Sequence, residues 1–166
     1  FYHHYMNKVY LLIGGNMGDR MANLDNALNL MESNLGKITL LSSRYETAAW
    51  GFTEQPHFLN QAVLLQTHFL ANDLMLAILN IEKAMGRERS IPLGPRIIDI
   101  DIIYFNEEII DNISVTIPHP KMTARRFVLL PLVEIAPDYI HPILLKSNSV
   151  LLKECGDSLA VNKKTP

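Results

Sequence analysis

The sequence predicts an α+β sandwich, with a largely antiparallel sheet and helices packed on one or both of its sides. Three observations support this: apolar stretches of strand length, two segments of helical periodicity, and connections of mixed length in the order strand, helix, strand, strand, helix, strand. With 166 residues and 48% hydrophobic content, the chain can bury one substantial core. We expect a single domain over residues 7–166 and a tag or linker over residues 1–6.

The first strand and helix are predicted from their apolar side chains. Residues 8–14 form a compact apolar stretch that ends at Gly14 and Gly15, which indicates a central strand entering a turn. Apolar residues then recur at helical spacing before Gly36, and they are Leu24, Ala27, Leu28, Met31 and Leu35. This spacing predicts a helix with one buried face.

Two more strands and a second helix follow. Residues 37–47 and 58–67 are expected to be strands, and the loop between them is too long for a tight hairpin. A helix is expected over residues 72–85, with a buried face of Leu74, Ala77, Ile78, Ile81 and Met85. Glu82 flanks that face.

A strand carrying two aligned carboxylates is predicted after Arg96. From Ile97 the pattern has period two, which places Asp99 and Asp101 on one face and Ile98, Ile100, Ile102 and Tyr104 on the other. Two residues along a strand span about 6.5 to 7 Å, so both carboxylates can reach one divalent ion or a close pair of ions. Mg²⁺ suits such a site because it binds to one or two carboxylates together with substrate phosphates.

Three arginines lie upstream of these aspartates. Arg87, Arg89 and Arg96 carry planar guanidinium groups that bind phosphate oxygens in a forked geometry. Together with the carboxylates, they predict chemistry on a nucleoside triphosphate. The alternative is an edge strand whose solvent-facing aspartates are merely neutralised by arginines.

The later elements are a turn at residues 106–107, a short strand near residues 108–111, and a helix over residues 125–136 despite Pro131.

Composition excludes several classes of protein. A net charge of -2 disfavours nucleic acid as the main partner, and the single cysteine excludes an internal disulfide. The chain lacks an apolar run of membrane-spanning length and a signal-peptide pattern, so we expect a cytoplasmic protein without a membrane partner.

Other candidate binding residues are weaker when taken singly. Phe58 and Asn60 share a strand face and could stack on and hydrogen-bond a heteroaromatic ring, although such a pair is more often part of a core. His119 lies between two prolines and could donate to a phosphate oxygen, with a turn histidine as the alternative. The turn at Gly14 and Gly15 could hold an anion, but it matches neither common phosphate-binding motif.

Taken together, the motifs resemble those of 6-hydroxymethyl-7,8-dihydropterin pyrophosphokinase, a family of folate-pathway enzymes. The resemblance covers about residues 8–142. It rests on the Gly-Gly-Asn turn at 14–16, Glu-Gln-Pro-His-Phe-Leu-Asn at 54–60, Gly-Pro-Arg-Ile-Ile-Asp-Ile-Asp-Ile at 94–102 and Thr-Ile-Pro-His at 116–119. The chain departs from the family pattern at Pro92 and Leu93, where a basic residue and often an aromatic one are usual.

The resemblance implies a ferredoxin-like fold and the transfer of pyrophosphate from ATP to the hydroxymethyl group of the pterin, releasing AMP. It implies that Asp99 and Asp101 bind two Mg²⁺ ions. The implied ATP-binding residues are Glu82, Arg87, Arg89, Arg96, Ile102, Thr116, His119 and Arg125. The implied pterin-binding residues are Thr47, Trp50, Phe58, Asn60 and Phe127. Catalysis would fall to Arg87, Arg89, Arg96, Asp99 and Asp101.

Two rival functions stay open at this point. A metal-dependent transferase acting on a nucleotide sugar could use the same aspartates, but it would not need Phe58 and Asn60. An RNA-binding module on a similar sheet would need exposed aromatics and a basic face, which the Asp-bearing strand does not supply. A monomer and a part of a folate-pathway fusion or complex are both compatible with the sequence.

Overall fold

The structure is a computed structural model that describes residues 5–49, 54–88 and 92–165. The strands are β1 (Asn7–Gly15), β2 (Lys37–Leu41), β3 (Tyr45–Thr47), β4 (Phe58–Thr67), β5 (Asp99–Phe105), β6 (Ile110–Asp111), β7 (Thr116–Ile117) and β8 (Val161–Lys163). The helices are α1 (Arg20–Asn34), α2 (Ala71–Ala84), the 3₁₀ helix η1 (Met122–Ala124), α3 (Arg126–Ile135) and α4 (Asn148–Glu154).

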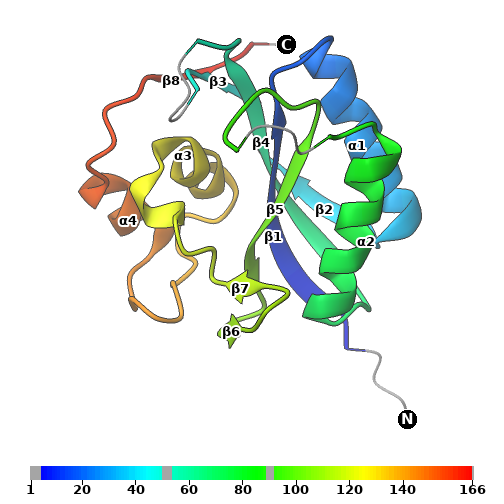
Figure 1. Ribbon diagram of the computed structural model, residues 1–166. Helices are drawn as coiled ribbons and strands as arrows, with labels where there is room; N and C mark the ends of the chain where they lie inside the picture. Colours follow the sequence, from blue (N-terminus) through cyan, green and yellow to red (C-terminus); the bar gives the residue numbers. More distant parts are fainter. Residues whose placement is uncertain (1–4, 50–53, 89–91, 166) are drawn as a thin grey trace.

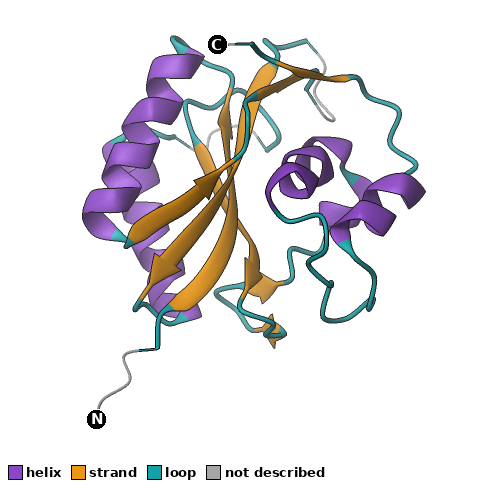
Figure 2. Cartoon of the chain, turned by 180° about the vertical axis from the view of Figure 1, so that it is seen from behind, coloured by secondary structure: helices purple, strands orange, loops and turns teal. Residues whose placement is uncertain are grey.

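An antiparallel sheet forms the middle layer of the molecule (Figure 1). In the described part of the chain its strand order is β5-β1-β4-β3-β8, and β2 also pairs with β4. Helices α1 and α2 cover one face, and α3 and α4 lie on the other, as the reverse view in Figure 2 also shows. The order β1, α1, β2 with β3, β4, α2, β5 is the ferredoxin-like arrangement. The predicted fold class is therefore confirmed.

Each face of the sheet has its own hydrophobic core. The core under α1 and α2 includes Leu24, Met31, Leu74, Ile78 and Ile100. The core under α3 includes Leu12, Ala62, Met122, Leu129 and Leu132. Because successive residues of a strand point to opposite faces, β1 contributes Leu11 to the first core and Leu12 to the second. The central strand β1 is thus buried on both faces, and α3 covers the face that carries the aspartates.

The two helices predicted from apolar spacing form where expected. Asp19 caps α1 by accepting a hydrogen bond from Ala22 N at 3.1 Å, and Leu24, Ala27 and Met31 are its buried residues. Helix α2 buries Leu74, Ile78 and Ile81 as predicted. It also buries Glu82, which the sequence placed only beside the apolar face.

The prediction of one continuous strand over residues 37–47 is wrong. It divides into β2 and β3, because residues 42–44 oppose only Gln61 and Ala62 of β4. Ser42 replaces the regular strand pairing at this point with side-chain hydrogen bonds. Its Oγ accepts a hydrogen bond from Ala62 N at 2.9 Å, and its carbonyl oxygen accepts one from Gln61 Nε2 at 2.7 Å. Next to this irregularity, Ser43 N and the Tyr45 hydroxyl donate to Glu134 of α3.

The predicted placement of Tyr104 is also wrong. The sequence pattern put Tyr104 on the face of Ile98, Ile100 and Ile102, but the structure packs it in the core under α3. The cause is a β-bulge: Leu11 pairs with Ile102 and Tyr10 with Tyr104, so Ile103 has no partner and the alternation shifts. Asp99 and Asp101 precede the bulge, so it does not affect their predicted common face.

The C-terminal residues, where the sequence predicts no element, form α4 and β8. Asn148 is completely buried, where its Oδ1 accepts from the Tyr104 hydroxyl at 2.8 Å and its Nδ2 donates to Ala136 O at 2.9 Å. Strand β8 extends the sheet beside β3. Within the part of the chain that the structure describes, no helix is both long and apolar enough to cross a membrane.

Replacement of Gly15 tests the tight contact between β1 and the segment before β5. A Cβ atom at Gly15 would lie 2.3 Å from Ile97 O, which is main chain and cannot rotate away. Gly15→Ala should therefore lower the free energy of unfolding by about 1–3 kcal/mol, measured by urea denaturation. Gly156→Ala is the matched control, since a Cβ there meets nothing within 4 Å. Equal stabilities for the two variants would contradict this packing.

Candidate active site

The two aspartates lie at the start of β5, on the face that α3 covers. Asp99 pairs with Gly14 of β1, and Asp101 pairs with Leu12, whose side chain belongs to the core under α3. Both aspartates are partly buried and line the same cavity. The prediction that their carboxylates share a face is confirmed.

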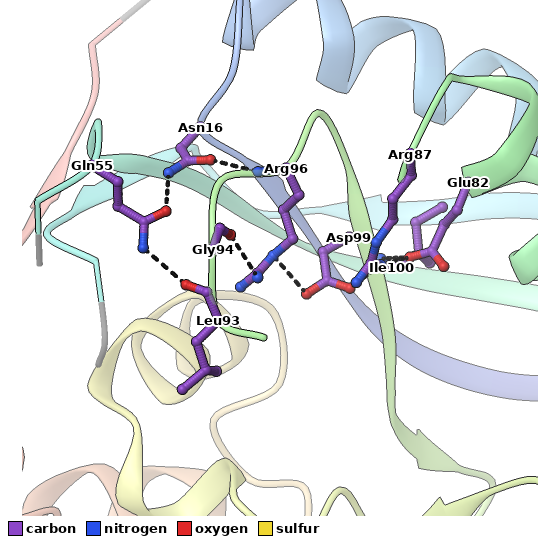
Figure 3. Close-up of polar contacts among 9 residues, drawn as sticks. All are labelled: Asn16, Gln55, Glu82, Arg87, Leu93, Gly94, Arg96, Asp99 and Ile100. Carbon is purple, nitrogen blue, oxygen red and sulfur yellow. Dashed lines mark hydrogen bonds and ion pairs between the residues drawn. The ribbon is translucent and has the colours of Figure 1, made fainter. Parts of the chain in front are cut away.

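Arg87 connects Asp99 to a buried glutamate. Its Nη1 donates to Asp99 Oδ1 at 2.7 Å and also to Glu82, whose Oε2 accepts from Ile100 N at 2.9 Å (Figure 3). Burial lowers the pKa of Arg87, but the carboxylates of Asp99 and Glu82 outweigh burial and raise that pKa above its usual value. Arg87 is thus fixed as a cation beside Asp99.

Arg96 approaches Asp99 from the other side. Its Nη1 donates to Gly94 O at 3.1 Å, and its Nε lies 3.3 Å from Asp99 Oδ2. The contact with Asp99 is an ion pair and not a hydrogen bond, so the buried Nε has no hydrogen-bond partner among the described residues. The guanidinium also covers the ring of Phe58, with its central carbon 4.7 Å from the ring centroid. Arg96 is therefore placed to meet an anion.

Asp101 differs from Asp99 in its electrostatic surroundings. The pKa of Asp101 is raised to about 7, first by burial and then by the negative charges of Asp99 and Glu82, against the opposing effects of Arg125 and Arg96. A nearby cation would stabilise the ionised form of this carboxylate. Among the described residues no three acidic, His or Cys side chains gather as a ligand set. The aspartate pair therefore suits an ion that takes its other oxygen ligands from a substrate or water.

Asn16 joins three segments around the site, a role that the sequence did not predict. Its Nδ2 donates to Gln55 Oε1 and to Pro56 O, both at 2.9 Å, and its Oδ1 accepts from Arg96 N at 2.9 Å. Gln55 Nε2 in turn donates to Leu93 O at 2.9 Å (Figure 3). The Gly-Gly-Asn and Glu-Gln-Pro motifs drew attention to both residues, but only the folded chain shows that they bind each other.

Two cavities meet at the aspartates. The inner cavity holds about 50 Å³ and is lined by Thr47, Phe58, Asn60 and Phe127 among others. The outer cleft holds about 540 Å³ and is lined by Arg87, His119 and Lys121 among others. Both cavities share Leu93, Arg96, Asp99, Asp101 and Arg125. The inner cavity has room for only one or two water molecules, so a larger ligand requires some wall to move.

The inner cavity contains an unpaired amide. Asn60 is buried, with 4% of its surface exposed, and its Nδ2 has no hydrogen-bond partner within the described residues. An unpaired buried donor is costly unless a ligand satisfies it. Phe58 and Phe127 supply aromatic surface in the same cavity, and Arg125 lies 5.7 Å from the centroid of the Phe127 ring.

His119 faces the outer cleft as a neutral donor. Burial, together with the positive charge of Arg125, lowers the pKa of His119 to about 4. Its Nδ1 accepts a hydrogen bond from Lys121 N at 3.2 Å, which leaves the proton on Nε2. His119 N donates to Ile103 O at 3.0 Å and thereby fixes this segment to β5.

The structure does not bring every expected residue into these cavities. Ile102 packs in the core under α1 and α2, on the face opposite the aspartates. Thr116 lines neither cavity, and its hydroxyl donates to Asp111 at 3.3 Å. Trp50 and Arg89 lie outside the described residues. The remaining expected residues other than Glu82 line one or both cavities, and Glu82 lies behind Arg87.

Comparison with known proteins places the chain in a family. The family model of 7,8-dihydro-6-hydroxymethylpterin-pyrophosphokinase (HPPK) matches residues 10–137. The chain is 41% identical over 141 residues to a 2-amino-4-hydroxy-6-hydroxymethyldihydropteridine pyrophosphokinase of Aquifex aeolicus, covering 85% of this chain and 88% of that protein. A protein of the same name from Bacillus subtilis is 40% identical over 130 residues, 78% of each chain.

Longer relatives contain a matching part. The chain is 44% identical over 138 residues to the folic acid synthesis protein FOL1 of Dictyostelium discoideum, where it spans 21% of the length. A crystal structure of wild-type HPPK-DHPS from Plasmodium falciparum superposes with a TM-score of 0.73 at 21% identity, covering 90% of this chain and 43% of that one. This likeness supports the fold. From the family match and the identities to proteins of similar length, we conclude that the chain belongs to the 7,8-dihydro-6-hydroxymethylpterin-pyrophosphokinase family.

Proposed function

We propose that this chain transfers the βγ-pyrophosphate of ATP to the hydroxymethyl oxygen of 6-hydroxymethyl-7,8-dihydropterin and releases AMP, in folate biosynthesis. Family membership gives the reaction class. The observation that carries the assignment of the site is the meeting of an aromatic cavity and a cationic cleft at Asp99 and Asp101. One compartment suits a flat heteroaromatic ring, and the other suits a triphosphate.

The inner cavity is the proposed pterin site. The unpaired Nδ2 of Asn60 would donate to a polar atom on the edge of the ring, and Phe58 and Phe127 would contact its faces. Arg96 covers Phe58 in the present arrangement, so ring stacking on Phe58 requires Arg96 to turn away. Such a movement would send a guanidinium toward the outer cleft, where the phosphates are expected. Thr47 lines this cavity, and Trp50 stays part of the proposal from the sequence.

The outer cleft is the proposed triphosphate site. Arg87 and Arg96 flank Asp99, while Arg125 and the Nε2–H of His119 offer further donors. Guanidinium groups bind phosphate oxygens well because the two geometries match. Glu82 would act by holding Arg87 in place, and Arg89 is proposed for the same cleft from the sequence. Ile102 could contribute only through its main chain, because its side chain faces the other core.

Asp99 and Asp101 are the proposed Mg²⁺ ligands, and two ions are proposed by resemblance to the family. Two carboxylate ligands, one with a raised pKa, fit a hard divalent cation that completes its shell with phosphate oxygens and water. When bound, Mg²⁺ would neutralise charge on the phosphates. Little covalent chemistry is left to the protein, which has to align the two substrates and exclude water.

The proposed step is a displacement at the β-phosphorus. The hydroxymethyl oxygen forms a bond to the β-phosphorus, the bond from that phosphorus to the oxygen bridging to the α-phosphorus breaks, and AMP leaves. The hydroxyl proton is released. Arg87 and Arg96 would stabilise the charge that moves onto the bridging oxygen.

Labelled ATP tests the proposed function. With ³²P at the β-position, Mg²⁺ and the reduced pterin alcohol, the label should appear in the pterin product while unlabelled AMP forms in equal amount. Thin-layer chromatography of the quenched mixture measures both. Formation of ADP with the label retained on it would mean transfer of a single phosphoryl group, and it would overturn the proposal.

A pair of neighbouring amides tests the pterin pocket. Asn60 Nδ2 lacks a partner, whereas the side chain of Gln61 binds Ser42 O and Arg44 on the opposite face of β4. Asn60→Ala should lower pterin affinity tenfold or more with little loss of stability, since no protein hydrogen bond through Nδ2 is removed. Gln61→Ala should lower stability, because it removes these hydrogen bonds, and should leave pterin affinity nearly unchanged. Calorimetric pterin titration and thermal unfolding of both variants provide the comparison, and unchanged pterin binding by Asn60→Ala would refute this pocket.

Asp101→Asn tests the electrostatics of the metal site. Because the pKa of Asp101 in the folded protein is about 7, against 3.8 ordinarily, the folded state holds a proton that the unfolded state releases between these values. As pH rises from about 4 to 7, the free energy of unfolding of the unaltered, metal-free protein should therefore fall by roughly a few kcal/mol relative to that of Asp101→Asn. The comparison between variants cancels the opposite contribution of His119, whose pKa is lowered.

Urea denaturation of both proteins across this pH range, without metal, measures the difference. Turnover should be lost in Asp101→Asn, and Mg²⁺ at pH 8 should stabilise only the unaltered protein. Parallel pH profiles for the two proteins would show that Asp101 does not carry a raised pKa.

A further inference from the structure

Helix α3 receives its N-terminal cap from a distant part of the chain. The residue at its own cap position, Arg125, provides no side-chain cap. Instead Asp157 Oδ2 accepts a hydrogen bond from Arg126 N at 3.0 Å, and Oδ1 of the same carboxylate accepts one from Leu159 N at 3.0 Å. Asp157 therefore ties the first turn of α3 to the C-terminal segment, where its charge also suits the helix dipole.

The same segment is bound to the sheet a few residues later. In β8, Val161 pairs with Thr47 of β3, and the Thr47 hydroxyl donates to Ala160 O at 3.2 Å. Lys164 N donates to Arg44 O at 2.8 Å. We call residues 157–164 the C-terminal strap. Figure 1 shows it in orange and red, running from beyond α4 to the sheet edge at β3.

Each of the two attachments of the C-terminal strap involves a residue that lines the inner cavity or is next to one in the chain. Thr47 lines that cavity from β3, and Phe127, the residue after Arg126, lines it from α3. A third contact joins the strap to the body of α3, where Lys163 Nζ lies 3.5 Å from Glu134 Oε1. Glu134 also accepts hydrogen bonds from Ser43 N at 2.8 Å and from the Tyr45 hydroxyl at 2.9 Å. These bonds connect α3 directly to β3 and to the residues before it.

We propose that the C-terminal strap is a positioning element of the pterin pocket, and that Asp157 acts by fixing the N-terminal turn of α3 and, through it, Phe127. The proposal rests on the proposed function of the inner cavity. It goes beyond the family match, which ends at residue 137. Asp157 itself lines neither cavity, so it is a positioning residue.

The test compares Asp157→Ala and Asp157→Asn with Glu154→Ala. Glu154 is the matched control because it is an acidic residue in the same region whose carboxylate binds only Lys146 in an exposed ion pair at 2.8 Å among the contacts described. Pterin affinity and the affinity for a non-hydrolysable ATP analogue are measured by calorimetry well below each variant's unfolding temperature. Asp157→Ala should lower pterin affinity by roughly fivefold or more and ATP-analogue affinity by less. Asp157→Asn keeps an acceptor oxygen and should recover most of the loss, and Glu154→Ala should bind as the unaltered protein does.

A double-mutant cycle shows whether Asp157 acts through Phe127. Asp157→Ala should cost little further pterin affinity in a protein that already carries Phe127→Ala, because the side chain that it positions is gone. Additive losses, equal losses for both ligands, or unchanged pterin binding by Asp157→Ala would each overturn the role of the strap while the unaltered protein binds the pterin. Failure of the unaltered protein to bind the pterin would overturn the proposed function, and the strap with it.

Discussion

The close approach of three strands at Gly14 and Gly15 is the constraint on which the rest of the site depends. A Cβ atom at Gly14 would lie 2.1 Å from Asn60 Oδ1 of β4, and one at Gly15 would lie 2.3 Å from the carbonyl of Ile97 just before β5. Since neither glycine has a side chain, the ends of these strands converge. The next residue, Asn16, then bonds to Arg96 and to the loop of Gln55 and Pro56. One strand end thus positions both cavities.

This convergence places two similar carboxylates in different electrostatic surroundings. Asp99 lies between Arg87 and Arg96, so two guanidinium groups already balance its charge. Burial raises the pKa of Asp101, and the negative charges of Asp99 and Glu82 act in the same direction. Asn60 Nδ2 and Arg96 Nε, both without a hydrogen-bond partner among the described residues, line the same inner cavity. We interpret the raised pKa of Asp101 and these two donors as features of a site built for a cation, phosphate oxygens and a heteroaromatic ring.

Much of the fold could be predicted from periodicity, and most failures have one physical cause. The apolar faces of α1 and α2 and the common face of the aspartates follow from spacing alone. Tyr104 and residues 37–47 were misplaced because β-bulges shift the pairing register, and a bulge has no clear signature in a single sequence. The bonds of Asn16, Gln55 and Asp157 join segments far apart in the chain, so no local pattern could reveal them.

The most direct measurement is a crystal structure with Mg²⁺, a non-hydrolysable ATP analogue and the pterin alcohol bound together. The proposed function predicts the pterin ring in the cavity of Phe58, Asn60 and Phe127, and the triphosphate along Arg87 and His119. The hydroxymethyl oxygen and the β-phosphorus should face each other beside Asp99 and Asp101, with metal on both carboxylates. A pterin bound elsewhere, or metal coordinated away from these aspartates, would contradict it.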